Sequence, residues 1–301
     1  MTRARVLTTG NRLDLRATMA KTGKGRNDPT LRFARDGVWR ATVTPEGSST
    51  VRVQHGGGMK LLVDAWGPGS DWTLDRAEDL LGLNDDRSGF RADRHPLVAR
   101  LDRDNPGLRI ARTNGVWHAL LPVLLSQKVT SAQAKRAYYG ILHRYGAPAP
   151  GPADLLSPPG PERLADLGYH DLHSLGVERR RAELVLRTAR RSQQLEALAE
   201  IDTELALKRL LALPGIGAWS VGRVSFVAFG DADAVAVGDY HLADDVCWGL
   251  AGEARGSDER MLELLGPFAG HRGRVIRLLS LGGIHAPKRG PRLAPMRIEQ
   301  I

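Results

Sequence analysis

The sequence has a single cysteine, Cys247, among its 301 residues. One thiol excludes an internal disulfide, a thiolate zinc site and an iron–sulfur cluster held by cysteines. The mostly apolar neighbours of Cys247 in DDVCWGLAG predict that it is a small buried side chain.

No apolar run is long enough to cross a bilayer, so no membrane partner is expected. The first residues, MTRARVLTTGNRLDL, are basic but lack the apolar core of a secretory signal. We therefore expect a cytoplasmic protein.

Acidic residues do not balance the basic ones. The chain has 34 Asp and Glu against 43 Lys and Arg, and its formal net charge is +9. This excess fits a phosphate-rich partner, because neutralised phosphates release counterions. Arginine-rich compositions also reach such a charge without nucleic acid, so charge alone does not identify the partner. With 42% hydrophobic and 26% charged residues, the composition is that of a globular protein of one or two domains.

The first third of the chain has the pattern of an antiparallel sheet. Short β-branched or alternating runs are separated by turn signals such as DG, PEGSS and HGGG. The runs cover residues 30–35, 37–44, 49–55 and 59–66, and a short helix is expected at 73–83, capped by Asp71 or Thr73. A polar passage at 84–107 predicts a boundary between a β-rich domain (1–107) and a helical domain (108–301). The predicted fold class is α+β, mainly helical, with a small N-terminal antiparallel sheet.

Helical periodicity begins near residue 115. Helices are expected at 115–127, 130–146, 177–198, 202–213, from about Ala218, at 259–268 and at 273–281. The segment 147–161 is a proline-rich connector.

Three short stretches within this helical part carry candidate chemistry. The first is LPGIG at 213–217, a tight turn between two helices. Gly215 and Gly217 can adopt conformations barred to other residues and allow close approach to the backbone. The helix that follows turns its unpaired amides the same way, and Ser220 adds a hydroxyl, so the turn predicts a phosphate site; a plain helical hairpin is the alternative.

The second stretch is GDYHL at 238–242, where an apolar run leads to Asp239 at the start of a new helix. Asp239 fits a helix cap, and a carboxylate held there is also oriented for chemistry. The third is LLSQKVT at 124–130, where one helix breaks at Gln127 and another begins. Gln127 can bond loop backbone or face a ligand.

In this order and spacing, LLSQKVT, LPGIGAWS and GDYHL resemble the helix-hairpin-helix DNA glycosylases, and within them the bacterial 3-methyladenine DNA glycosylase II type. The resemblance covers roughly residues 110–285, and the subfamily also carries a small β domain before its helices. It implies that damaged double-stranded DNA is the partner and that the damaged nucleotide rotates into a pocket. A protein that scans duplex DNA in this way suits a monomer.

The resemblance implies roles for individual residues. The family carboxylate matches Asp239, which would stabilise positive charge on the sugar and orient water. Strand-cutting relatives carry a lysine nucleophile where this chain has Trp219, so a monofunctional glycosylase that leaves an abasic site is expected. The DNA-binding positions match Gly215, Ile216, Gly217, Ala218, Ser220, Gln127 and Lys128. Hairpin carbonyls near Leu213 and Ile216 can hold K⁺ or Na⁺ in the family; no other cofactor and no metal bound by side chains is expected.

The pocket departs from the family pattern. Trp219 and Tyr240 match aromatic pocket positions, and Trp117 either lines the same pocket or packs in the core. Arg223 replaces a tyrosine, and GHRGRVIRLL lacks the usual pocket tryptophan. Lys128 stands where an apolar wedge is usual, so the means of holding the duplex open is not carried over.

Two alternatives stay open. One is a DNA-binding protein of the same fold without catalysis, and the other is a glycosylase for a neutral or bulky lesion in place of an alkylated base.

Overall fold

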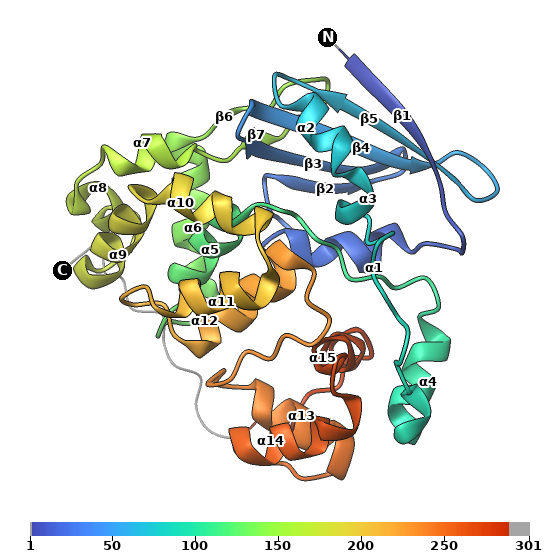
Figure 1. Ribbon diagram of the computed structural model, residues 1–301. Helices are drawn as coiled ribbons and strands as arrows, with labels where there is room; N and C mark the ends of the chain where they lie inside the picture. The colour runs from blue at the N-terminus through green and yellow to red at the C-terminus, as the bar shows by residue number, and fades with distance from the viewer. Residues whose placement is uncertain (1, 289–301) are drawn as a thin grey trace.

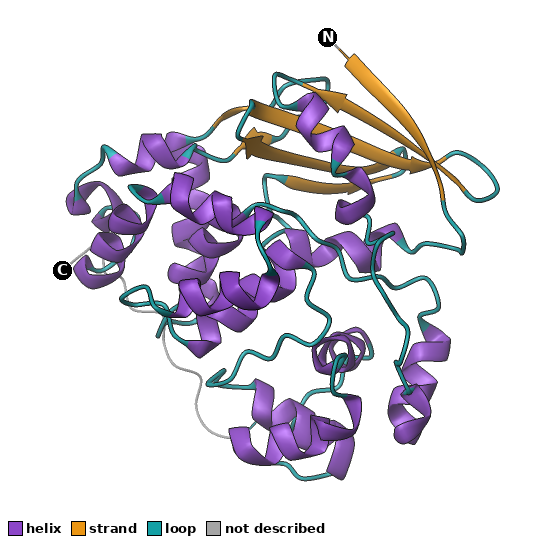
Figure 2. Cartoon of the chain, viewed as in Figure 1, coloured by secondary structure: helices purple, strands orange, loops and turns teal. Residues whose placement is uncertain are grey.

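The computed structural model describes residues 2–288 (Figure 1). A five-stranded antiparallel sheet, in the order β1-β5-β4-β3-β2, forms the N-terminal part. Helices build most of the remainder (Figure 2). The strands are β1 (Thr2–Thr8), β2 (Leu31–Ala34), β3 (Gly37–Thr44), β4 (Gly47–His55) and β5 (Lys60–Trp66), with a separate pair β6 (Ala147–Pro148) and β7 (Leu156–Ser157). The predicted α+β fold class is confirmed.

β-branched or alternating runs, separated by turn signals, explain why β2 to β5 could be predicted. Val53 pairs with Val38 on one side and Val63 on the other, and all three are buried in one core. Strand β1 is not among the predicted strands. Its only buried residue is Leu7, because it lies at the edge of the sheet and pairs with β5 alone.

The two faces of the sheet pack differently. One face packs with α1 (Leu15–Met19), α2 (Ser70–Asp75) and α3 (Ala77–Leu80). On the other, Trp39 stacks on Trp66 with ring centroids 5.2 Å apart. In place of the single helix predicted at 73–83, the structure has two short helices, α2 and α3. Helix α2 begins after Gly69, so neither Asp71 nor Thr73 is its cap. The hydroxyl of Thr73 instead donates to Ser49 Oγ at 2.7 Å, within the fold.

The helical part has a large core built by α5, α6, α9, α11 and α12. Its elements are η2 (Ala92–Arg94), α4 (Pro96–Asp104), α5 (Val116–Leu124), α6 (Ser131–Tyr145), α7 (Pro161–Ala165), α8 (Tyr169–His173), α9 (Arg179–Ala189), α10 (Ser192–Glu196), η3 (Ala197–Glu200), α11 (Thr203–Leu211), α12 (Ala218–Val224), the π-helical turn η4 (Ser225–Phe229), α13 (Leu242–Ala251), α14 (Asp258–Leu265), η5 (Gly266–Phe268) and α15 (Arg272–Leu281); the 3-10 turn η1 (Ala20–Thr22) follows α1. Cys247 is fully buried, as predicted.

The single helix predicted at 177–198 is wrong. Helix α9 ends at Ala189, and α10 begins at Ser192. The turn between them brings the carboxylate of Glu196 to the start of α5, where it accepts the amides of Val116 and Trp117, both at 2.9 Å. Burial raises the pKa of Glu196, and these two hydrogen bonds oppose that rise.

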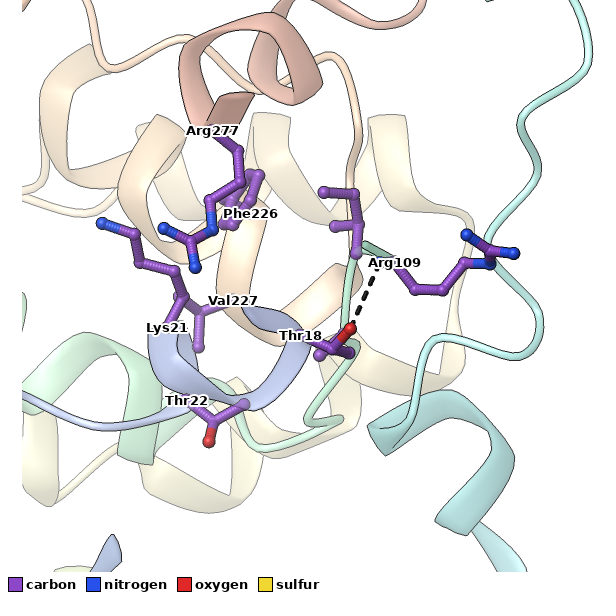
Figure 3. Close-up of a pocket in the computed structure, with 9 residues that line it drawn as sticks. Thr18, Lys21, Thr22, Arg109, Phe226, Val227 and Arg277 are labelled. Carbon is purple, nitrogen blue, oxygen red and sulfur yellow. Dashed lines mark hydrogen bonds between the residues drawn. The ribbon is translucent and has the colours of Figure 1, made fainter. Parts of the chain in front are cut away.

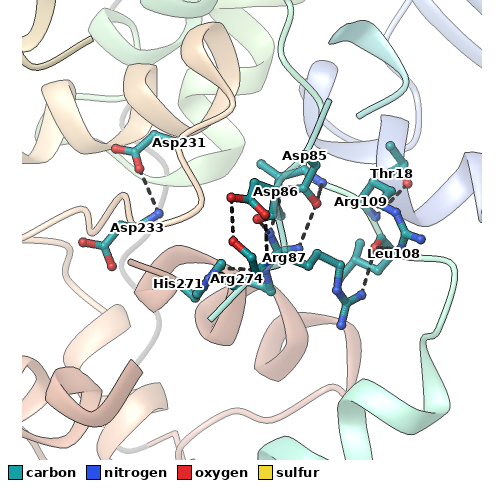
Figure 4. Close-up of polar contacts among 12 residues, drawn as sticks. Thr18, Asp85, Asp86, Arg87, Leu108, Arg109, Asp231, Asp233, His271 and Arg274 are labelled. Carbon is teal, nitrogen blue, oxygen red and sulfur yellow. Dashed lines mark hydrogen bonds and ion pairs between the residues drawn. The ribbon is translucent and has the colours of Figure 1, made fainter. Parts of the chain in front are cut away.

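A further core joins α13, α14 and α15 to α4. Helix α4 lies within the polar passage that the sequence assigned to the first domain, yet it packs against α15. Beside it, Arg274 of α15 forms a buried ion pair with Asp85, at 2.6 Å and 2.9 Å (Figure 4). The division at 107/108 stays a prediction, and part of the second predicted domain lies outside the described residues.

Within residues 2–288, no helix has the length and apolar character needed to span a bilayer. The same residues hold no group of three or more histidine, cysteine or acidic side chains suited to a metal ion.

Candidate active site

The hairpin at 213–217 joins α11 to α12. The amide of Ile216 donates to the carbonyl of Leu213 at 3.0 Å, which closes the turn. Gly215 adopts a φ of +91°, a conformation that L side chains rarely take. The side chain of Ile216 is buried in the helical core. The hairpin thus turns its backbone at Gly215 and Gly217 outward.

Helix α12 begins at Ala218, as predicted. The amide of Val221 donates to the carbonyl of Gly217 at 3.0 Å, which is the first bond of the helix. The amides before it are those that a helix start leaves unpaired, and they carry the positive end of the helix dipole. A Cβ at residue 217 would meet no atom within 4 Å, so the backbone there is open to a ligand.

Gln127 ties the loop after α5 to this hairpin. Its Nε2 donates to the carbonyl of Gly215 at 2.9 Å and to Ser220 Oγ at 3.1 Å. Ser220 is buried and its hydroxyl accepts a hydrogen bond from Gln127, and its predicted contact with DNA stays a prediction. Sequence reasoning expected Gln127 to bond backbone or face a ligand, and here it bonds backbone.

Lys128 lies at the exposed tip of the same loop. Its φ is +55°, in the left-handed region that favours glycine. A lysine held there carries a cost of about 1–2 kcal/mol, which the braced loop around it offsets. Lys128 directly follows Gln127, whose side chain contacts the hairpin.

The carbonyls of Leu213, Pro214 and Gly215 accept hydrogen bonds. The carbonyl of Pro214 accepts from Arg187 Nη2 of α9 at 3.1 Å, and Leu213 accepts from Ile216 within the turn. Arg187 therefore places positive charge beside the hairpin without an ion. The expected K⁺ or Na⁺ near Leu213 and Ile216 stays a prediction.

Asp239 lies at the end of the loop that follows η4. Its Oδ1 accepts the amides of His241 and Leu242 at 3.1 Å and 3.3 Å, at the start of α13. Its Oδ2 accepts the indole Nε1–H of Trp219 at 2.8 Å. Both carboxylate oxygens of Asp239 thus accept hydrogen bonds, Oδ1 from the amides at the start of α13 and Oδ2 from the indole on α12. The sequence marked both residues, but not the bond between them.

Side-chain hydrogen bonds and an ion pair fix the loop that carries Asp239 at the residues that precede it. Asp231 accepts Ser225 Oγ at 2.6 Å, and Asp233 pairs with Arg272 of α15, with Nε at 2.9 Å. The pKa of Asp233 is lowered: burial alone would raise it, but the hydrogen bonds and charge of Arg272 outweigh that effect. Figure 4 shows Asp231 and Asp233 on this loop, beside α15.

Two glycines fit the last part of the loop against its surroundings. A Cβ on Gly222 of α12 would lie 2.3 Å from the carbonyl oxygen of Val235. Only a glycine lets α12 approach the loop this closely. Gly238 takes a φ of +87°, and its amide donates to Asp258 of α14 at 2.9 Å.

The four expected pocket residues are not all together. Trp219 is partly buried beside Asp239. Tyr240 is 86% exposed and makes an edge contact with His241. Trp117 is 0% exposed and packs in the helical core, and its role in a base pocket stays a prediction. Its helix, α5, packs against α9, α10 and α12.

Arg223 is exposed and lies four residues beyond Trp219, on the same face of α12. Burial lowers the pKa of Lys21 and of Lys24 in the N-terminal part, and the charge of Arg223 adds to this effect. No local pattern marked these lysines, since they lie about two hundred residues before the hairpin. A cavity of about 10 Å³, lined in part by Lys21 and Arg277, has room for one water (Figure 3).

Comparison with known proteins gives a sequence likeness over part of the chain. No protein-family model matches. The chain is 27% identical over 145 residues to DNA-3-methyladenine glycosylase 2 of Escherichia coli (strain K12), which is 48% of this chain and 51% of that protein. The chain spans about half the length of the curated relatives it matches.

Solved structures give a likeness over nearly the whole chain. The 3-methyladenine DNA-glycosylase from Archaeoglobus fulgidus superposes with a TM-score of 0.77 at 20% identity, covering 92% of this chain and 97% of that one. The 8-oxoguanine glycosylase/lyase of Clostridium acetobutylicum, solved in complex with double-stranded DNA, gives 0.68 at 15% identity, covering 94% and 98%. These comparisons confirm the resemblance found in the sequence: the chain has the helix-hairpin-helix DNA glycosylase fold and is similar in sequence to the DNA-3-methyladenine glycosylase 2 type.

Proposed function

We propose that this chain is a monofunctional DNA glycosylase that hydrolyses the N-glycosidic bond of a damaged base rotated out of double-stranded DNA. The observation that carries the proposal is the position of Asp239. Its carboxylate is held by Trp219 and by two amides of α13, beside the helix that begins at the hairpin. The likeness to DNA-3-methyladenine glycosylase 2 supports an alkylated base as the first substrate class to test.

The proposed reaction needs one carboxylate and one water. As the bond from C1′ to the base nitrogen breaks, its electron pair leaves with the base and the sugar becomes positive. The fixed negative charge of Asp239 stabilises that sugar, and its oxygens orient the water that adds to C1′. The proton lost by the water passes to Asp239 or to solvent. The product is a free base and an abasic site.

The absence of strand cleavage is part of the proposal. Trp219 has no amine, so it cannot form the Schiff base that opens an abasic sugar. The amine of Lys24 is hydrogen-bonded to Ser126 Oγ at 2.7 Å and to the carbonyl of Pro122 at 3.4 Å. Borohydride added during turnover is expected to trap no protein–DNA adduct. A trapped adduct would contradict this part of the proposal and leave base release standing.

The deciding experiment measures base release and abasic sites from duplex DNA treated with a methylating agent. The unmodified protein is expected to release base, and Asp239→Asn to lose this activity by about 10² to 10³-fold, because a fixed charge at the reacting centre is removed. Asp75→Asn, an exposed carboxylate on α2, is the matched control. Binding without any release by the unmodified protein would favour a non-catalytic DNA-binding protein of the same fold.

The proposed contact with DNA phosphate is made by the open backbone at Gly217 and Ala218. Gly217→Ala is the clean test, because residue 217 is extended and has free space around it, with φ −102° and ψ −178°. We expect weaker binding to every duplex alike and an unchanged melting temperature. Gly215→Ala is unsuitable, since its φ of +91° would strain the fold itself. Unchanged binding by Gly217→Ala would show that phosphate does not approach this backbone.

A further inference from the structure

The three consecutive arginines that open α9 have different surroundings. Arg179 Nε donates to the carboxylate of Glu183 at 2.7 Å. Arg181 is buried, and its Nη1 donates to the carbonyl of Leu125 at 2.7 Å. Arg180, between them, is exposed, and no carboxylate among the described residues pairs with it. Of the three, Arg180 is therefore the one whose charge is available to a partner.

Helix α9 packs along the hairpin that joins α11 to α12. Arg187 Nη2 donates to the carbonyl of Pro214 at 3.1 Å. Three residues earlier, the buried side chain of Leu184 lies so close to Gly215 that a Cβ there would be 2.8 Å from Leu184 Cδ1. These two contacts place the side of α9 that carries Leu184 and Arg187 against the hairpin.

Arg180 lies on the same side of α9 as Arg187. Seven residues make two helical turns less about 20°, so the two side chains leave the helix in nearly the same direction, about 10 Å apart along its axis. Arg191, which is exposed just past the end of α9, continues the line four residues beyond Arg187. We call Arg180, Arg187 and Arg191 the arginine stripe.

The charge of the arginine stripe is not compensated. Within residues 2–288, no acidic side chain forms an ion pair with any of its members. The two carboxylates at the start of the helix are paired elsewhere, Glu178 with Arg181 and Glu183 with Arg179. The stripe is therefore an exposed line of positive charge about 16 Å long, with the hairpin beside it.

We propose that the arginine stripe binds the phosphate backbone of the duplex on one flank of the damaged nucleotide, so that the DNA follows α9 as it leaves the hairpin. This inference rests on the proposed function and adds a second contact surface to the hairpin. Guanidinium groups bind phosphate through paired hydrogen bonds. Each strand of a duplex carries one phosphate for about 3.4 Å of its axis, so the spacing of Arg180 from Arg187 corresponds to about three base pairs.

The test measures dissociation constants by fluorescence anisotropy with duplexes that carry a tetrahydrofuran analogue of an abasic site, so that no base release is needed. The flank on one side or on the other is shortened stepwise from about twelve to about two base pairs. The proteins are the unmodified chain, Arg180→Met, Arg180→Lys and Arg100→Met. Arg100 is the matched control, because it is an exposed arginine on α4, which lies on the opposite side of the molecule from α9 (Figure 1).

We expect Arg180→Met to weaken binding to the longest duplex about fivefold at about 0.15 M salt and to reduce the salt slope by about one. This loss should vanish when one flank, and only that flank, is shortened past the contact. Arg180→Lys keeps the charge and should keep most of the affinity, and Arg100→Met should bind every duplex like the unmodified protein.

Three results would overturn the proposal. The first is equal binding of the longest duplex by Arg180→Met and the unmodified protein. The second is a loss that is the same at every flank length, because a contact on one flank cannot act on DNA that lacks it. The third is an equal loss in Arg100→Met, which would assign the effect to net charge.

Base release from methylated duplex, measured with the same proteins, separates this inference from the proposed function. If the flank dependence is found but the unmodified protein releases no base, the arginine stripe stands and the glycosylase proposal fails. If base is released and Arg180→Met binds every duplex like the unmodified protein, the inference fails and the glycosylase proposal stands.

Discussion

Gly222 allows α12 to touch the loop that carries Asp239, and its replacement by alanine gives a sharp prediction. A Cβ at this position would lie 2.3 Å from the carbonyl oxygen of Val235, 2.8 Å from its carbonyl carbon and 3.0 Å from Cα of Ala236. All three are backbone atoms, so no side chain can rotate away. Since ordinary contact begins at 3.4 Å, the helix or the loop must move by about 1 Å.

That movement reaches Asp239, the proposed catalytic residue. Asp239 follows Val235 by four residues, and its carboxylate is 2.8 Å from Trp219 Nε1. A shift of about 1 Å would lengthen this contact beyond hydrogen-bonding distance. A misplacement of this size costs about 10²-fold in rate, and overpacking costs about 1–3 kcal/mol of stability.

Single-turnover base release and thermal melting measure the two effects separately. Gly222→Ala is expected to release base about 100-fold more slowly and to melt a few degrees lower. The control is Gly266→Ala, because a Cβ at Gly266 would meet nothing within 4 Å. If Gly222→Ala melts and reacts like the unmodified protein, the close approach of α12 does not position Asp239.

Three more predictions concern stability and binding. Asp85→Asn leaves the buried Arg274 without its carboxylate partner and should cost about 3–5 kcal/mol in urea unfolding; removal of both charges by Asp85→Leu with Arg274→Met should cost less, and the opposite order would contradict the reasoning. Arg187→Met should weaken binding to all duplexes alike and reduce the salt slope by about one, measured by anisotropy titration; a sequence-dependent loss would refute a phosphate contact. Burial first, then the charge of Arg40, lower the pKa of His118 to about 4. The unfolded chain therefore takes up the proton first, and up to about 3 kcal/mol of stability is lost as pH falls from 6.5 to 4; His118→Gln should lose less between urea midpoints at pH 7 and pH 4.5, and an equal loss would exclude this histidine as the cause.

Local pattern was enough to predict β2 to β5, including the edge strand β2, but not the opposite edge strand, β1. β-branched or alternating runs bounded by turn signals mark β2 to β5, while β1 buries only Leu7 and is held by its pairing with β5. The break before α10 is likewise set from a distance. It exists because the carboxylate of Glu196 caps α5, seventy-nine residues before it in the chain at Trp117.

The parts of the site were predictable one at a time, and their contacts were not. The turn at Gly215 and the loop at Asp239 have local signals. Nothing local shows that Trp219 donates to Asp239, that Ser220 faces Gln127, or that Trp117 turns into the core. Each depends on how a helix is rotated against its neighbours, which spacing along one sequence does not determine.

The bond between Trp219 and Asp239 joins two separately packed groups of helices. Trp219 packs against the core of the helical part, whereas the loop of Asp239 is fastened to α14 through Asp258 and to α15 through Asp233. Any hinge opening between these groups would pull the carboxylate from the indole while both cores stayed folded. The catalysis proposed for Asp239 then depends on the alignment of these two groups of helices, so a substitution of Asp258 is expected to affect it.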